Sequence, residues 1–354
     1  MEQNQLGEVV APLLDWYGKN KRCLPWRRDR EPYHIWISEI MLQQTRVEAV
    51  IPYYERFMER LPCAASLASC EDEELFKLWE GLGYYSRARN LKKAAQEICT
   101  KYQGIFPCKF EEILDLPGIG AYTAGAISSI AFEEPRAAVD GNVLRVITRL
   151  TQDCRDITDA KFRAEITEAL ERIYPQVGRG DFTQSLMELG AVVCVPNGKP
   201  KCEDCPLALL CGAYQNNTQS LYPVKKKKAA RKIEQKTILI IKYQDMIAIR
   251  KRESKGVLSG MWELPNLNGE LTKAQVLQWV SEQQFAVGDI QKSDNAGKPF
   301  KHIFTHIEWH MTCWVVTCES VAKGNSFTWV TARQLESDIA LPTAFKKVFE
   351  KTNR

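Results

Sequence analysis

Residues 194–211 read CVPNGKPKCEDCPLALLC and bring Cys194, Cys202, Cys205 and Cys211 into one short loop that closes a long stretch of helical sequence. Thiolates at this spacing can hold one metal centre only if the chain turns tightly, and the intervening prolines and glycine favour such turns. Structural zinc sites usually pair two C-x2-C units across a longer span, and only Cys202 and Cys205 have this spacing. The compact loop therefore favours a [4Fe-4S] cluster over zinc, and unrelated buried thiols are the remaining alternative.

Length and composition limit the class of protein. The chain has 354 residues, of which 45% are hydrophobic, and a formal net charge of +4. This length favours two domains, and the small charge permits a local basic surface. No apolar run reaches the roughly 18 residues of a membrane-spanning helix, and the N-terminal residues lack a secretory signal pattern. We therefore expect a cytoplasmic protein without a membrane segment, in which the twelve cysteines are reduced or bound to metal.

The hydrophobic pattern changes once along the chain. Residues 1–216 predict an all-α domain, and residues 217–235, which include the basic run KKKKAARK, predict a solvated linker. Residues 236–354 predict a smaller α+β domain. The clearest helical periodicities in the first domain lie at Tyr33–Val50, Glu73–Trp79, Ala88–Tyr102, Ala121–Ala131, Val143–Leu150, Phe162–Ile173 and Phe182–Val193. The second domain has strand patterns at Thr237–Tyr243, Met246–Arg250 and Trp309–Thr317, and helical patterns at Lys273–Gln284 and Pro342–Lys351.

Two short motifs follow one another in the helical domain. In LPGIGAYTAGAI (116–127), Gly118 and Gly120 permit a hairpin whose backbone N–H groups bind a phosphate, although an ordinary helix–helix turn is also possible. In AVDGNVLRV (138–146), Asp140 precedes an apolar helix. Its carboxylate is either the N-cap of that helix or an acidic group at the rim of a cleft.

A third motif places an acidic residue inside an apolar helix. In HIWISEIMLQQT (34–45), helical spacing puts Ile35, Glu39 and Leu42 on one face. Burial disfavours the charged form of a carboxyl group, so a buried Glu39 would have a raised pKa and could act as a proton donor. A Glu39 side chain that faces solvent is the alternative.

Together with LPW (24–26), LQQT (42–45) and GLGYYSRA (81–88), these motifs resemble the endonuclease III superfamily of DNA glycosylases. Within it, the chain resembles the MutY-type adenine DNA glycosylases over essentially its whole length. The resemblance implies a helix-hairpin-helix glycosylase domain with a [4Fe-4S] loop, followed by a Nudix-like domain. It also implies a monomer that acts in base excision repair on double-stranded DNA with adenine opposite 8-oxoguanine or guanine.

The resemblance assigns roles to the catalytic candidates. It makes Glu39 the general acid that protonates adenine and then helps to activate water. Asp140 would stabilise the sugar cation or add to it, as in other two-carboxylate glycoside hydrolyses. Asn142 would orient Asp140 and the water, and Tyr122 would form a hydrogen bond near Asp140 and the sugar. Tyr122 occupies the position of the Schiff-base lysine in strand-cleaving relatives, so hydrolysis without strand cleavage is implied.

The resemblance also places residues at the DNA. It assigns Trp26, Arg27 and Gln184 to the pocket for the extruded adenine, and Gln44 and Tyr84 to the vacated base stack. Thr45, at the end of the helical pattern that contains Glu39, is a further candidate for a contact with a base edge.

In the second domain, Phe304, Thr305 and His306 match the family's Phe-Ser-His turn, which reads 8-oxoguanine. Two departures from the family pattern stand out. Thr305 replaces serine, and seven rather than six residues separate Cys194 from Cys202.

Other functions fit parts of the pattern. An endonuclease III-type glycosylase and lyase for oxidised pyrimidines would need a lysine in place of Tyr122. A non-catalytic iron–sulfur DNA-binding protein would need neither Glu39 nor Asp140. A Nudix hydrolase would need the REx2EE glutamates after GMWELP (260–265), and these are missing.

Overall fold

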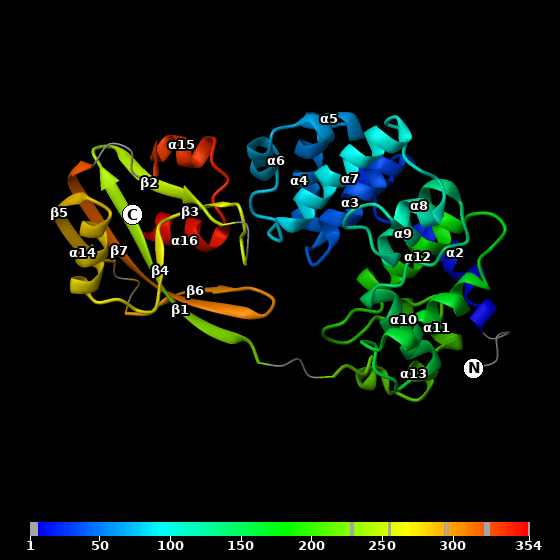
Figure 1. The fold of residues 1–354 in the computed structure, drawn as a ribbon. Coiled ribbons are helices and arrows are strands. Elements are labelled where there is room, and N and C mark those ends of the chain that lie inside the picture. Colours follow the sequence, from blue (N-terminus) through cyan, green and yellow to red (C-terminus); the bar gives the residue numbers. More distant parts are fainter. Residues whose placement is uncertain are drawn as a thin grey trace. The chain divides into compact units, whose positions relative to one another are not determined.

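The computed structural model describes residues 6–226, 230–253, 256–293, 295, 297–321 and 326–352. The chain divides into two compact units, residues 1–69 with 89–227 and residues 70–88 with 228–354 (Figure 1). The short segment 70–88 therefore groups with the C-terminal unit, although the sequence places it inside the helical domain. Within the described ranges, no helix is long and apolar enough to cross a membrane.

The first unit consists of helices, and its described residues contain no strand, which confirms the all-α prediction. Short 3-10 helices at Pro25–Arg27, Cys202–Asp204, Ala208–Leu210 and Gln219–Leu221 supplement them. The α-helices are α2 (Val10–Asn20), α3 (Pro32–Leu42), α4 (Val47–Arg60), α5 (Ala64–Ser69), α7 (Ser86–Tyr102, which begins in the segment 70–88), α8 (Phe110–Leu114), α9 (Ala121–Phe132), α10 (Gly141–Thr151), α11 (Ala160–Glu171), α12 (Arg179–Val192) and α13 (Gly212–Gln215).

Helix α9 is the central element of this unit, because it packs against α3, α8 and α12. Small residues let its neighbours approach closely. A Cβ atom on Gly125 would lie 2.4 Å from the backbone oxygen of Ala137, and one on Gly180 of α12 would lie 2.9 Å from the Cα atom of Ile130. These glycines let α9 pack closely against the segment before α10 and against α12, and the first turn of α9 carries Tyr122.

The prediction of one helix over Tyr33–Val50 is wrong. Helix α3 ends at Leu42 and α4 begins at Val47. Gln44 adopts a left-handed backbone conformation with φ of 59°, which interrupts the helix although the hydrophobic pattern continues across it. The predicted linker is also shorter than expected. Gln219–Leu221 forms a 3-10 helix and β1 begins at Lys232, while residues 227–229 lie outside the described residues.

The second unit is a mixed β-sheet with helices, as the sequence predicts. The strands are β1 (Lys232–Tyr243), β2 (Met246–Lys251), β3 (Trp262–Glu263), β4 (Asn266–Asn268), β5 (Phe285–Lys292), β6 (Phe300–Ile303), β7 (Ile307–Val321) and β8 (Thr328–Thr331). The helices are α6 (Asp72–Leu78), α14 (Lys273–Glu282), α15 (Ala332–Ser337) and α16 (Thr343–Thr352). Strands β1 and β7 pair in parallel from Lys232 opposite Ile307 to Tyr243 opposite Cys318.

Alternation along β1 builds a core on each face of the sheet. Ile238 and Ile240 pack in the core that contains Phe345 of α16, whereas Leu239 and Ile241 pack in the core that contains Val276 of α14. Both faces of this strand are therefore buried, which explains why its sequence is a continuous apolar run.

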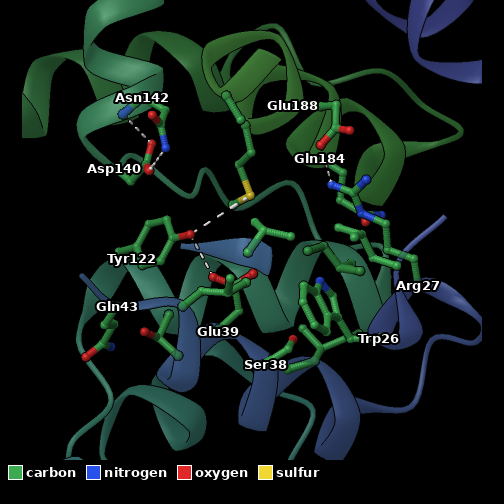
Figure 2. Close-up of a pocket in the computed structure, with 18 of the residues that line it drawn as sticks. Trp26, Arg27, Ser38, Glu39, Gln43, Tyr122, Asp140, Asn142, Gln184 and Glu188 are labelled. Atoms are coloured by element: carbon green, nitrogen blue, oxygen red, sulfur yellow. Dashed lines mark hydrogen bonds and ion pairs between the residues drawn. The ribbon is translucent and has the colours of Figure 1, made fainter. Parts of the chain in front are cut away.

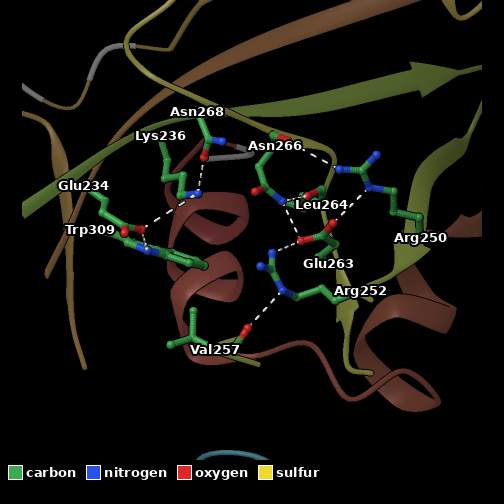
Figure 3. Close-up of polar contacts among 10 residues, drawn as sticks. All are labelled: Glu234, Lys236, Arg250, Arg252, Val257, Glu263, Leu264, Asn266, Asn268 and Trp309. Carbon is green, nitrogen blue, oxygen red and sulfur yellow. Dashed lines mark hydrogen bonds and ion pairs between the residues drawn. The ribbon is translucent and has the colours of Figure 1, made fainter. Parts of the chain in front are cut away.

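A buried carboxylate ties the strands β2 and β3 together (Figure 3). Glu263 accepts hydrogen bonds from Arg250 Nε at 2.9 Å and from Asn266 Nδ2 at 2.6 Å, and it forms an ion pair with Arg252. Its side chain is only 4% exposed. Glu263 is thus bound by other side chains, and α14, which reads KAQVLQWVSE, lacks the REx2EE glutamates. The described residues therefore keep the Nudix-like architecture without the glutamate cluster of a Nudix hydrolase.

Candidate active site

One pocket of the first unit collects most of the predicted catalytic and base-binding residues (Figure 2). Its volume is about 530 Å³. Helices α3, α9, α10 and α12 line it, together with the 3-10 helix Pro25–Arg27. The predicted residues that line it are Trp26, Arg27, Glu39, Gln44, Thr45, Gly120, Tyr122, Asp140, Asn142 and Gln184.

Glu39 lies on α3 with only 7% of its surface exposed. Burial raises its pKa to about 7, and the negative charge of Asp140 acts in the same direction. A hydrogen bond from the Tyr122 hydroxyl to Glu39 Oε2, at 2.7 Å, and the charge of Arg27 oppose the rise. The predicted buried carboxyl group is thus present, and about half of it is protonated near neutral pH.

Tyr122 stands at the N-terminus of α9, directly after the hairpin. Gly118 makes the hairpin possible, because its φ is +79° and a Cβ atom there would lie 2.6 Å from Asn90 Cβ. Gly120 is the N-cap residue of α9. Burial raises the pKa of Tyr122 well above its ordinary value, so the phenol stays neutral and donates. Its hydroxyl donates to Glu39 and weakly to Met187 Sδ, at 4.0 Å, whereas the resemblance implied a hydrogen bond near Asp140.

Asp140 satisfies both interpretations of its sequence motif. Its Oδ1 atom accepts hydrogen bonds from the backbone N–H groups of Asn142 and Val143, each at 2.8 Å, and so caps α10. Its Oδ2 atom accepts from Asn142 Nδ2 at 2.7 Å, and the residue also lines the pocket. Burial raises the pKa of Asp140 against these donors. The side chain and backbone of Asn142 thus both hold the Asp140 carboxyl group.

Arg145 connects Asn142 to the cysteine loop, and sequence reasoning missed it. Its Nη2 atom donates to Asn142 Oδ1 at 2.9 Å and to the Gly190 backbone oxygen at 2.7 Å, and its Nε atom donates to the Cys194 backbone oxygen at 2.8 Å. Asn142 is a local partner on the same helix, but Gly190 and Cys194 lie 45 and 49 residues away, so no local pattern predicts the arrangement.

The opposite side of the pocket holds a second buried carboxylate that the sequence did not reveal. Glu188 Oε1 accepts from Arg22 Nε at 2.7 Å, and Glu188 Oε2 accepts from Arg27 Nη2 at 2.9 Å. Burial alone would raise the pKa of Glu188, but the hydrogen bonds from Arg22 and Arg27 outweigh it and lower this pKa to about 2. Trp26 is buried, lines the same pocket and contacts Tyr54 edge to face, with ring centroids 5.3 Å apart. The pocket thus holds three carboxyl groups, of which burial raises the pKa of Glu39 and Asp140, whereas the arginines lower the pKa of Glu188.

The remaining DNA candidates lie elsewhere. Gly118 shapes the hairpin without lining the pocket. Tyr84 belongs to the segment 70–88, is 45% exposed and has a left-handed φ of 50°.

In the second unit, the predicted lesion turn is anchored by aromatic contacts. Phe304 packs on Trp309, with ring centroids 4.8 Å apart. Its N–H group donates to the Ile307 backbone oxygen at 2.8 Å. Thr305 and His306 are exposed at the tip, so the turn presents these two side chains rather than Phe304.

Cys194, Cys202, Cys205 and Cys211 line one small cavity. Arg149 Nη1 donates to Cys194 Sγ at 3.2 Å and Gln219 Nε2 donates to Cys202 Sγ at 3.8 Å. Burial raises the pKa of the Cys205 thiol to about 12, and the neighbouring thiols add to this effect. In the part of the chain that the structure describes, no group of histidine, cysteine and acidic side chains has the arrangement of a metal-ion site. The donor set itself, four thiols that line one cavity with hydrogen-bond donors at two of the sulfurs, has the ligand type of an iron–sulfur cluster.

Comparisons with known families agree with this architecture. Residues 37–172 match the HhH-GPD superfamily base excision DNA repair protein family, and residues 237–351 match the NUDIX domain family. The helical part resembles a thermostable thymine-DNA glycosylase at 32% identity and a TM-score of 0.55, covering 60% of this chain and 98% of that one. It also resembles endonuclease III in a non-covalent DNA complex, at 26% identity and a TM-score of 0.53, over 62% of this chain and 99% of that one. Fold and site thus define a helix-hairpin-helix DNA glycosylase with a C-terminal Nudix-like domain.

Full-length relatives narrow this class further. An adenine DNA glycosylase of Buchnera aphidicola subsp. Baizongia pistaciae is 34% identical over 97% of this chain and 96% of its own length. The Homo sapiens adenine DNA glycosylase is 32% identical over 97% of this chain and 74% of its own length. The chain belongs to the adenine DNA glycosylase family.

Proposed function

We propose that the protein hydrolyses the N-glycosidic bond of adenine mispaired with 8-oxoguanine or guanine in double-stranded DNA and leaves the strand intact. Membership of the family supports adenine removal in base excision repair. The observation that carries the mechanism is Glu39, a buried carboxyl group with a pKa of about 7 in one pocket with Asp140. An adenine must leave the base stack to enter such a pocket.

Glu39 acts as the general acid. Loss of adenine leaves negative charge on the base, and a proton delivered to the base removes that charge. A proton donor is most effective when its pKa lies near the working pH, and burial of Glu39 provides this match. The hydroxyl of Tyr122 fixes the orientation of the Glu39 carboxyl group through their 2.7 Å hydrogen bond.

Asp140 acts on the sugar. Departure of the base leaves positive charge on the ring, and an ionised carboxylate held by Asn142 would stabilise it. The backbone N–H groups of Asn142 and Val143 favour the ionised form of Asp140, which opposes the effect of burial. Tyr122 has no amine with which to form an imine to the sugar, so the chemistry ends at an abasic site.

The iron–sulfur cluster is a structural proposal. Cys194, Cys202, Cys205 and Cys211 would hold it, and when bound it would cross-link the loop through four Fe–S bonds. Arg149 and Gln219 would then donate hydrogen bonds to two of the ligand sulfurs. As ligands the four cysteines would bind as thiolates, although burial raises the pKa of the Cys205 thiol.

Recognition of the opposite base belongs to the second unit. Thr305 and His306 are exposed at the tip of a turn anchored by Phe304, so they are available to a nucleobase. 8-Oxoguanine differs from guanine in its O8 and N7–H groups, and the threonine hydroxyl can accept or donate a hydrogen bond there.

A single-turnover assay tests the proposal. Duplexes carry adenine opposite 8-oxoguanine, adenine opposite guanine, adenine opposite thymine, or thymine glycol, and each product is analysed with and without alkali. We expect excision of adenine from the two mispairs, with strand breaks only after alkali. Strand cleavage without alkali that borohydride traps on the protein, or release of thymine glycol in preference to adenine, would contradict the proposal.

A further inference from the structure

A short loop between α6 and α7 presents Tyr84. The residue is 45% exposed, and its left-handed φ of 50° is unfavourable for a bulky residue such as tyrosine. Gly81 and Gly83 have φ values of 105° and 71°, so the backbone before Tyr84 is also in the left-handed region. A loop of this kind keeps one conformation only if its surroundings hold it.

Arg87, three residues after Tyr84, stabilises this loop conformation. It is a buried cation with 9% of its surface exposed. Its Nη2 atom donates to the backbone oxygens of Leu82 and Gly83, each at 3.2 Å, and its backbone N–H donates to the Tyr84 oxygen at 2.9 Å. The side chain and backbone of Arg87 thus bind three successive carbonyl groups that end at Tyr84.

The guanidinium group also faces two aromatic rings. Its central carbon lies 5.4 Å from the ring of Trp79 and 5.4 Å from the ring of Tyr84. Trp79 in turn donates through Nε1 to the Gly83 oxygen at 3.0 Å. Burial lowers the pKa of Arg87 to about 10, so the group remains a cation at neutral pH. Arg87 therefore contacts both the ring of Tyr84 and the backbone that carries it.

We propose that Arg87 is a positioning residue that holds Tyr84 in the exposed, left-handed conformation in which its ring enters the DNA base stack when adenine leaves it. This inference rests on the proposed function, because it needs an adenine that leaves the stack. Arginine suits the role better than lysine, since one planar group must donate to two carbonyl oxygens while it faces aromatic rings.

Four variants test it: Arg87→Met, Arg87→Lys, Tyr84→Ala and the double variant Tyr84→Ala with Arg87→Met. Adenine excision under single-turnover conditions is measured for each, together with the fluorescence of 2-aminopurine placed next to the target adenine, which reports opening of the stack. The loss of two hydrogen bonds and a cation–π contact predicts a fall of about tenfold in excision and stack opening for Arg87→Met. Arg87→Lys should be less impaired than Arg87→Met but remain below wild type, because an ammonium group lacks the planar set of donors of a guanidinium group.

The double variant decides between positioning and general structural support. If Arg87 acts through Tyr84, Tyr84→Ala with Arg87→Met is no slower than Tyr84→Ala alone, because the group that Arg87 positions is already absent. Losses that multiply in the double variant, or an Arg87→Met protein with wild-type stack opening, would overturn the inference. Wild-type stack opening in Tyr84→Ala would overturn it as well.

Two controls separate this result from other failures. Wild-type excision of adenine is established first, so a protein without that activity would refute the proposed function rather than the role of Arg87. Thermal unfolding of each variant, and Arg179→Met as a matched loss of a partly buried arginine, report general damage. Arg179 donates to the backbone oxygens of Pro175 and Glu133. These three residues belong to the first unit, whereas Tyr84 belongs to the second.

Discussion

The pH dependence of excision should be set by Glu39 and altered by Tyr122 in a predictable direction. With a pKa of about 7, Glu39 is about half protonated at pH 7, whereas a carboxyl group with the ordinary value of 4.5 would be protonated to only about 0.3%. The raised pKa of Glu39 thus keeps a large fraction of the group able to donate a proton at neutral pH. The excision rate should fall about tenfold per pH unit above the pKa of Glu39, because only the protonated form is active.

Tyr122→Phe is the informative perturbation. The Tyr122 hydroxyl donates to Glu39 at 2.7 Å and stabilises the ionised carboxylate, so this hydrogen bond lowers the pKa of Glu39. A hydrogen bond to a charged group contributes about 1.5–3 kcal/mol, and 1.36 kcal/mol corresponds to one pKa unit. Its removal should therefore move the alkaline limb of the rate profile upward by about one to two pH units. The maximal rate should fall as well, because Glu39 loses its orienting partner.

Single-turnover rates between pH 5 and 10 measure this shift without interference from product release. Tyr174→Phe is the matched control, because it removes a buried hydroxyl that contacts Thr183 and the Arg136 oxygen. This control should leave the alkaline limb in place. The reasoning is refuted if Tyr122→Phe leaves the limb unchanged or moves it to lower pH, or if Glu39→Gln keeps both the limb and more than about a tenth of the wild-type rate.

Three further outcomes follow from the same structure. Glu39→Gln should unfold at a higher temperature than wild type at pH 8 and at the same temperature at pH 4. The folded-state pKa of Glu39, about 7, lies above the ordinary 4.5, so Glu39 destabilises the folded state progressively as the pH rises between these two values. Equal melting temperatures at pH 8 would argue against a buried charge. Glu188→Gln should destabilise the helical unit by about 3 kcal/mol at pH 7, because Arg22 and Arg27 lose their ionised partner, and denaturant unfolding of wild type and variant measures this. A chain that ends near Val224 should still excise adenine but discriminate less between 8-oxoguanine and guanine as the opposite base. His306→Ala should reproduce part of this loss, and Thr305→Ser should be nearly neutral. If truncation leaves the ratio of excision rates for the two opposite bases unchanged, recognition lies in the helical unit.

Local sequence patterns were sufficient for much of this protein. Helical and strand periodicities separate an all-α part from an α+β part, because one is set by 3.6 residues per turn and the other by two. Asp140 was recognisable as a helix cap, because its partners Asn142 and Val143 are its near neighbours in sequence. The role of Tyr122 came from the resemblance, whereas the metal-binding role of the four cysteines came from their spacing as well, and both stay predictions. The cysteines share one cavity, as their spacing suggested.

The tertiary structure decided what depends on distant partners. Glu188 pairs with Arg22 across 166 residues and with Arg27 across 161, and neither pairing was predicted from sequence. The parallel pairing of β1 with β7 and the break of the first predicted helix at Gln44 were likewise invisible to local periodicity. For Glu39 the sequence predicted only the direction of its pKa shift. Its value of about 7 is a balance of burial, the Tyr122 hydroxyl 83 residues away and the charges of Asp140 and Arg27. Desolvation and Coulomb energies act through space, so only the fold that assembles these groups determines that balance.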